Sequence, residues 1–243
     1  MRKYLSIICL ILVAIAVFFL RDEERLLSTV QESTVQSTIP KYVVVIDAGH
    51  GGFDPGKVGV GGELEKEINL SITLKLKKLL ELNDCEVILT RETEDGLYSP
   101  EDSNKKQVDM RKRIEIIREA KPDVAISIHQ NSFTQESSKG AQVFYYVKSS
   151  QGKKLAEIIQ EQLKITLNDG NHRFAKSNDS YYMLKKSECP LVIVECGFLS
   201  NRVESQLLKD DAYQEKVAWG IHLGILDYLN NETETERKEN RLN

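Results

Sequence analysis

The sequence predicts an α/β fold, a single domain with a mostly parallel sheet of about six strands flanked by helices. Three observations predict this fold class. Runs of β-branched residues alternate along the chain with segments in which apolar residues recur at helical spacing. The apolar runs are continuous, which is typical of parallel strands that are covered on both faces. No internal repeat interrupts the region from residue 41 to residue 229, which is the expected folded domain.

The first expected strand and helix follow directly from their patterns. Residues 42–46 form a β-branched run bounded by Asp47 and glycines, which predicts a buried strand. From Glu65 as far as Leu80, apolar residues fall on one helical face, which predicts a helix. The segment between them is rich in glycine, and glycines let a backbone bend closely around a site.

The later elements continue the same alternation. Apolar runs predict the strands, while Pro122 and the turn sequence Asp-Gly170-Asn mark the ends of two helices. The further strands are expected at residues 85–90, 124–128, 141–147 and 191–194. The further helices are expected at residues 108–120, 153–167 and 212–229.

The two ends of the chain differ from this domain in composition. Residues 1–20 hold Arg2 and Lys3 followed by an apolar run long enough for a bilayer core, which predicts a membrane anchor or signal segment, with an uncleaved anchor favoured. Residues 21–40 are expected to be a flexible stalk, and residues 230–243 a charged tail. By the positive-inside rule the domain is expected on the extracytoplasmic face, tethered to the membrane.

Composition argues against several classes of function. A net charge of −4 and a pI near 5.7 provide no general basic surface, so nucleic acid is not an expected partner. The four cysteines include no Cys-x-x-Cys pair, so neither a disulfide framework nor a thiolate zinc site is indicated. Buried free thiols are expected instead.

Three of the expected strands end in side chains that can bind a metal or carry a proton. The first runs into Asp-Ala-Gly-His50-Gly-Gly, the third ends at His129, and the last ends at Glu195. Ligands of open α/β sheets bind outside the carboxyl ends of the strands, so these side chains are expected to converge on one crevice. Glu65, at the start of the first helix, is a fourth candidate.

Zinc is the metal that such a set of side chains suits. Two imidazoles and one carboxylate leave a fourth position for water, and zinc lowers the pKa of that water to about 7. A second carboxylate can then shuttle the proton. The residues alone leave open whether Glu65 or Glu195 is the ligand. Purely structural explanations also exist, such as an anion loop around His50, a helix N-terminal carboxylate at Glu65, or core positions for His129 and Glu195.

Four segments, in this order along the chain, resemble the motif series of the N-acetylmuramoyl-L-alanine amidase type 3 family. They are Val-Ile-Asp-Ala-Gly-His50-Gly-Gly-Phe-Asp-Pro-Gly, Glu65-Lys-Glu-Ile-Asn-Leu, Ser-Ile-His129-Gln-Asn and Glu195-Cys-Gly-Phe-Leu-Ser-Asn. The resemblance covers the whole expected domain, and as a set it is specific. Ala48 departs from the family, which has proline there, and no role depends on that side chain.

The resemblance implies a zinc hydrolase that cuts the amide bond between N-acetylmuramic acid and L-alanine in peptidoglycan. Carried over by motif, His50, Glu65 and His129 bind Zn²⁺, and Glu195 is the catalytic general base and acid. The short extracytoplasmic part also resembles the spore-cortex amidases of the muramic δ-lactam pathway. That narrower resemblance implies a role in cortex maturation, a place in the spore intermembrane space and an accessory lipoprotein as partner, although no residue pattern indicates the lipoprotein.

Two other functions are compatible with the same residues. One is a zinc peptidase that cuts within the stem peptide, and the other is a non-catalytic scaffold that binds peptidoglycan strands. The products of digestion separate the first from an amidase, because only an amidase releases peptides that begin with L-alanine and leaves bare muramic acid.

Several polar residues outside this set are open to more than one explanation. Arg91 is expected either to grip a stem-peptide carboxylate or to form a surface ion pair, and Asn131 either to orient its neighbours or to contact substrate. His172 is expected to be solvated, and His222 to face the core from the last helix. The charges of residues 105–118 are attributed mainly to solvent exposure.

Overall fold

The structure is a computed structural model that describes residues 41–231. The predicted membrane segment, the stalk and the chain beyond residue 231 lie outside the described residues. Over residues 41–231, no helix combines the length with the apolar character that crossing a bilayer requires.

The strands form one sheet in the order β2-β1-β3-β6-β4-β5. They are β1 (Tyr42–Ala48), β2 (Cys85–Leu89), β3 (Val124–Asn131), β4 (Gln142–Tyr146), β5 (Lys176–Asn178) and β6 (Leu191–Phe198). The first four in the sheet order are parallel, β4 pairs antiparallel with β6, and β5 pairs parallel with β4. The predicted six-stranded, mostly parallel sheet is therefore confirmed.

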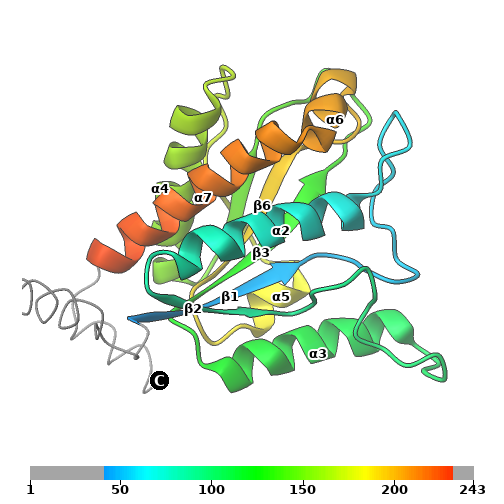
Figure 1. Cartoon of the computed structure of the whole chain (residues 1–243), viewed down its shortest axis with the longest axis vertical. Helices are drawn as coiled ribbons and strands as arrows, with labels where there is room; N and C mark the ends of the chain where they lie inside the picture. The colour runs from blue at the N-terminus through cyan, green and yellow to red at the C-terminus, as the bar shows by residue number, and fades with distance from the viewer. Residues whose placement is uncertain (1–40, 232–243) are drawn as a thin grey trace, which may run out of the picture. The chain divides into compact units, whose positions relative to one another are not determined.

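Helices cover both faces of this sheet (Figure 1). They are α2 (Glu65–Glu81), α3 (Lys105–Ala120), α4 (Ser150–Leu167), α5 (Tyr182–Lys186), α6 (Arg202–Lys209) and α7 (Asp211–Asn231). α2, α4 and α7 share one hydrophobic cluster with the sheet, whereas α3 and α5 share the cluster on the opposite face. Both faces of the central strands are therefore buried, which explains their continuous apolar sequences.

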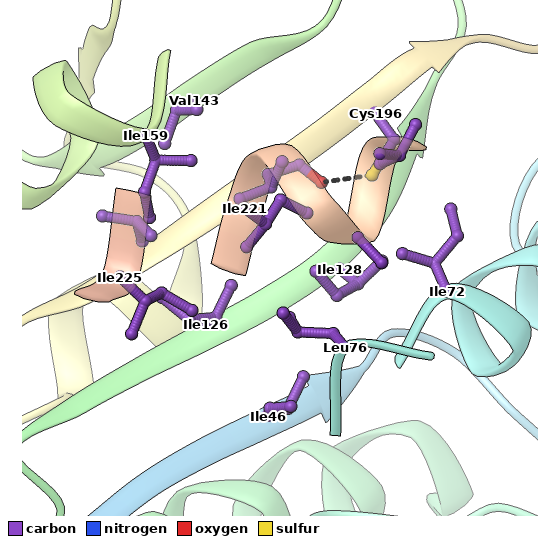
Figure 2. Packing of buried hydrophobic residues seen from close by; sticks show 14 of the residues in the cluster. Ile46, Ile72, Leu76, Ile126, Ile128, Val143, Ile159, Cys196, Ile221 and Ile225 are labelled. Atoms are coloured by element: carbon purple, nitrogen blue, oxygen red, sulfur yellow. Dashed lines mark hydrogen bonds between the residues drawn. The ribbon is translucent and has the colours of Figure 1, made fainter. Parts of the chain in front are cut away.

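The larger core lies between the sheet and α2, α4 and α7, and Figure 2 shows part of it. Ile126 and Ile128 of β3 lie near Ile221 and Ile225 of α7, and all four side chains are fully buried. Burying an isoleucine side chain contributes roughly 1.5–3 kcal/mol. The strands that carry the site residues are thus anchored in the larger hydrophobic core.

Helix boundaries differ from the predicted ones where a polar side chain caps the helix. α3 begins three residues earlier than expected, because the Asn104 side chain accepts a hydrogen bond from the backbone N–H of Gln107. α4 likewise begins at Ser150, because Ser149 caps the N–H of Gly152. The predicted tail starts two residues too early, since α7 continues to Asn231.

The described cysteines carry free thiols, as expected. Cys85 and Cys196 are buried, whereas Cys189 is only partly buried. Burial raises the pKa of Cys85 and of Cys189 to about 11, and raises the pKa of Cys196 further.

Candidate active site

The carboxyl ends of three neighbouring strands bring the predicted site residues together. β3 lies between β1 and β6, and its Ile128 and His129 pair in register with Ala48 and Glu195. His50 follows the end of β1, and the centroid of its ring lies 4.9 Å from that of His129. The predicted convergence at this edge of the sheet is therefore confirmed.

His50 lies in a turn with unusual backbone angles. Its φ is 62°, and Gly51 and Gly52 follow with φ of 138° and 59°. Left-handed backbone is uncommon for a residue with a side chain. This turn therefore fixes the direction in which the His50 ring points. His50 Nε2 lies 3.2 Å from Glu65 Oε1, and Nδ1 lies 3.0 Å from Asp54 Oδ2.

Glu65 is the point at which both histidines meet. Its side chain is 2% exposed, and Oε1 lies 2.9 Å from His129 Nδ1 as well as 3.2 Å from His50 Nε2. The backbone N–H groups of Gln130 and Lys57 donate to its two oxygens at 3.0 and 2.7 Å, which fixes the carboxylate. One ligand atom from each of His50, Glu65 and His129 lies within 4.8 Å of the other two.

The charges in this cluster favour an ionised carboxylate. Burial alone would raise the pKa of Glu65, but hydrogen bonds and positive charge from His129 and His50 outweigh burial and hold that pKa far below its usual range. Burial would lower the pKa of His129, and its hydrogen bond and attraction to Glu65 raise it instead. A buried carboxylate between two imidazoles has the charge that a divalent cation site needs.

The chemistry and the shape of this set both fit zinc. Two imidazole nitrogens and one carboxylate oxygen are a zinc ligand set that leaves a coordination position open. Two glycines leave room for these three side chains. A Cβ at Gly49 would lie 2.3 Å from the His129 ring. A Cβ at Gly56 would lie 2.6 Å from Glu65 Oε2 and 2.7 Å from His50 Cδ2.

Glu195 lies beside these three residues with a different electrostatic character. Its side chain is 8% exposed, and its Oε2 is buried without a hydrogen-bond partner in the described part of the chain. Burial raises the pKa of Glu195 to about 7; the nearby charge of His129 opposes this and that of Glu65 reinforces it. A carboxyl group with a pKa near neutrality and a free oxygen can both take and give a proton.

A buried ion pair supports the site from the α3 side. Arg113 Nη1 lies 2.6 Å from Asp47 Oδ1, and the same guanidinium donates to the carbonyl oxygens of Ala48 and His50 at 2.7 and 2.6 Å. Most charges of residues 105–118 are exposed, as expected, and Arg113, which is 1% exposed, is the exception. Its donors fix the backbone on both sides of the His50 turn.

Arg91 has neither of the two roles considered for it. It is 4% exposed, and its guanidinium donates to the carbonyl oxygens of Ala48, Gly49, Lys66 and Thr93 at 2.7–3.1 Å. These bonds use four of its five N–H donors and its side chain is buried, so it neither reaches a substrate carboxylate nor forms a surface ion pair. It holds the start of α2 against the end of β1.

The remaining polar residues follow simpler roles. Asn131 Oδ1 accepts a hydrogen bond from the N–H of Ser132 at 2.8 Å, which orders the turn after β3. His172 is exposed, and His222 is buried in α7, as the sequence predicts.

A cavity of about 330 Å³ opens beside the His50–Glu195 edge. Phe53 and Tyr98, whose rings meet edge to face at 5.1 Å, line this cavity, and so does Tyr182 at the start of α5. Lys106 of α3 also lines it, with its Nζ 3.5 Å from Asp54 Oδ2. The cavity thus combines apolar walls with a polar floor at the strand ends.

Two contributors to the site are missing from the sequence-based set. Asp54, which contacts His50 Nδ1, lies four residues beyond it in the glycine-rich segment, and that proximity was a usable signal. Arg113 shares one helical face with Met110, Ile114 and Ile117, and a charged residue within an apolar stripe indicates a buried ion pair.

Comparisons with known proteins agree with this geometry. A family described as N-acetylmuramoyl-L-alanine amidase matches residues 44–227. The chain is 37% identical over 191 residues to the germination-specific N-acetylmuramoyl-L-alanine amidase of Bacillus subtilis strain 168, covering 77% of this chain and 79% of that protein.

Two solved structures show the same fold. The CwlD amidase of Clostridioides difficile, solved in complex with the GerS lipoprotein, matches with a TM-score of 0.77 and 43% identity, covering 79% of this chain and 100% of that one. The catalytic domain of CwlV, an N-acetylmuramoyl-L-alanine amidase from Bacillus (Paenibacillus) polymyxa var. colistinus, matches with a TM-score of 0.69 and 30% identity, covering 79% of this chain and 99% of that one.

Proposed function

The chain belongs to the N-acetylmuramoyl-L-alanine amidase family, and on that premise we propose that it hydrolyses its substrate with zinc held by His50, Glu65 and His129 and with Glu195 as general base and acid. The substrate class is peptidoglycan, and the bond is the amide between the lactyl group of N-acetylmuramic acid and L-alanine. The observation that carries the proposal is the meeting of His50 Nε2 and His129 Nδ1 on one oxygen of Glu65.

The division of roles between the two glutamates follows from their surroundings. Glu65 is fixed by two backbone N–H groups and two imidazoles, so it suits a ligand that stays ionised. Glu195 has a free buried oxygen and a pKa of about 7, so it suits proton transfer.

The reaction then uses the residues in distinct ways. When bound, zinc supplies Lewis acidity toward the scissile carbonyl and toward water. Glu195 takes a proton from the attacking water and delivers it to the departing L-alanine nitrogen. Arg113 and Arg91 keep the His50 turn in place during this exchange, because they bond to its backbone.

A Glu195→Gln variant tests this assignment. We expect it to keep its fold and its zinc while turnover of purified sacculi falls by roughly a hundredfold or more, because the amide cannot accept the proton. After digestion of sacculi by the wild-type chain, mass spectrometry should detect peptides that begin with L-alanine and glycan strands with bare muramic acid. Glu188→Gln, at an exposed position, is the matched control. Retained hydrolysis by Glu195→Gln would remove Glu195 from the mechanism.

We also propose a role in cortex maturation, from the likeness to a germination-specific amidase and to CwlD. By analogy with the CwlD–GerS complex, an accessory lipoprotein is the proposed partner, and the extracytoplasmic face of the membrane is the proposed location. Spores of the source organism that lack this chain should contain cortex without muramic δ-lactam. Cortex with normal δ-lactam content would argue against this role but not against the amidase activity.

A further inference from the structure

Lys106 provides a positive charge at the cavity that a ligand can reach. Among the described residues that line the cavity, the other strong cation is Arg113, whose side chain is 2% exposed and bonded to Asp47 and Asp109. The side chain of Lys106 is 69% exposed and lies at the start of α3, where the helix dipole adds positive potential. An anion that enters this cavity therefore finds one accessible ammonium group.

The position of Lys106 relates it to the reacting centre. Its Nζ lies 3.5 Å from Asp54 Oδ2, which lies 3.0 Å from His50 Nδ1, so a single carboxylate separates the ammonium group from the histidine cluster. Asp54 already accepts a backbone hydrogen bond from Gly56 and contacts His50. Since an ammonium group has three donors, Lys106 retains donors for a second acceptor.

The substrate supplies such an acceptor at a matching place. This step rests on the proposed function. In a peptidoglycan stem peptide the second residue is a glutamate joined through its side-chain carboxyl, so its α-carboxyl group is free and lies one residue beyond the scissile amide. Without Lys106, the carboxylate of Asp54 at the cavity would repel that group.

We propose that Lys106 binds the free α-carboxylate of the second stem-peptide residue, and that the enzyme thereby prefers stem peptides in which this group is not amidated. The carboxylate-binding role considered for Arg91 thus falls to Lys106, because Arg91 is buried and bonded to backbone carbonyl groups in the interior. The stem peptide then leaves the site toward α3, and the sugar lies toward Tyr182 of α5, whose side chain is 42% exposed.

The test compares two substrates that differ in one group. These are peptidoglycan tetrasaccharides that carry L-alanyl-D-glutamate or L-alanyl-D-isoglutamine on muramic acid, each incubated with the zinc-loaded full chain. We expect a kcat/KM ratio of roughly two- to fivefold in favour of the free acid, the size that one exposed ion pair provides. Lys106→Gln should reduce the ratio to near unity through a higher KM for the acid, and Lys106→Arg should restore it.

Matched variants separate this role from general effects. Lys112→Gln, at an exposed position on the same helix, and Tyr182→Ala, at the start of α5, should both leave the acid-to-amide ratio unchanged. Zinc content should be equal in all variants. Equal rates of the wild-type chain on both substrates, or an unchanged ratio in Lys106→Gln, would overturn the Lys106 subsite alone. Failure of the wild-type chain to cut either substrate would instead overturn the proposed function.

Discussion

Arg113 and Asp47 form an ion pair in the interior, with Nη1 and Oδ1 2.6 Å apart, directly behind the turn that carries His50. The Asp47 carboxylate also accepts hydrogen bonds from the hydroxyl groups of Thr90 and Ser127. Burial alone would raise the pKa of Asp47, but the charge of Arg113 and these hydrogen bonds outweigh it and lower the pKa from 3.8 to about 2. The Asp47 carboxylate is therefore ionised in the interior, where it holds Arg113 against the backbone of the His50 turn.

The first prediction concerns the contribution of Asp47 to the free energy of unfolding, which should depend on pH. Because the pKa of Asp47 is lower in the folded chain than in the unfolded one, its stabilisation is complete above pH 3.8 and is lost as the pH falls toward 2. This contribution amounts to about 2 kcal/mol. Denaturant unfolding in EDTA should find Asp47→Asn less stable than wild type at pH 6, with the difference narrowing by about that amount below pH 3.8. A pH-independent difference would contradict the assignment.

The second prediction concerns the metal ligands. His50→Ala and His129→Ala should each lose most of their zinc, because each removes one of three protein ligands. Metal analysis after dialysis measures the content. His172→Ala, at an exposed loop position, is the control and should retain the wild-type content. Wild-type zinc in either of the first two variants would take that histidine out of the ligand set.

The third prediction concerns Asp54, which positions His50 through Nδ1 at 3.0 Å. Partners of metal-bound histidines fix the tautomer and the ring orientation, and losing one typically weakens metal affinity by roughly 10–100-fold. Asp54→Asn should therefore bind zinc more weakly in competition with a chromophoric chelator. Asp179→Asn, at an exposed bend, controls for the change of charge and should bind as tightly as wild type.

The fourth prediction compares two glycines that have similar backbone angles. Gly56 and Gly62 have φ of 71° and 89°, so alanine strains the backbone at either position. A Cβ at Gly56 would collide with Glu65 and His50, whereas one at Gly62 would have no neighbour within 4 Å. Both variants should unfold at a lower denaturant concentration than wild type. The free energy of unfolding should fall by about 1 kcal/mol or more. Zinc should be lost in Gly56→Ala and kept in Gly62→Ala. Equal zinc content in the two variants would show that Gly56 is not needed to make room for Glu65 and His50.

The site could be predicted from the sequence because it depends on strand ends. His50, His129 and Glu195 each follow a readable apolar run, and parallel strands place their carboxyl ends at one edge. Glu65 was a candidate from the sequence, but its position on a helix did not distinguish it from an ordinary first-turn carboxylate. The resemblance assigned it to the ligand set. These residues are brought together by the same sheet that the pattern predicts.

Other features depend on contacts that a local pattern does not contain. Arg91 bonds to Gly49, 42 positions away, and Arg113 bonds to Asp47, 66 positions away. The identity of these partners becomes visible only in the folded chain. β5 and α5 have three and five residues, too short for a periodic signal. α6 did have a signal, since Asn201 and Glu204 are spaced like a helix N-cap and its third residue.

The high pKa values of the described thiols bear on how the folded domain reacts with disulfides. Cys85, Cys189 and Cys196 are almost entirely protonated at neutral pH, and the thiolate is the form that exchanges with disulfides. In the folded domain these three thiols are therefore poor nucleophiles for disulfide exchange, and none of them is part of a disulfide bond.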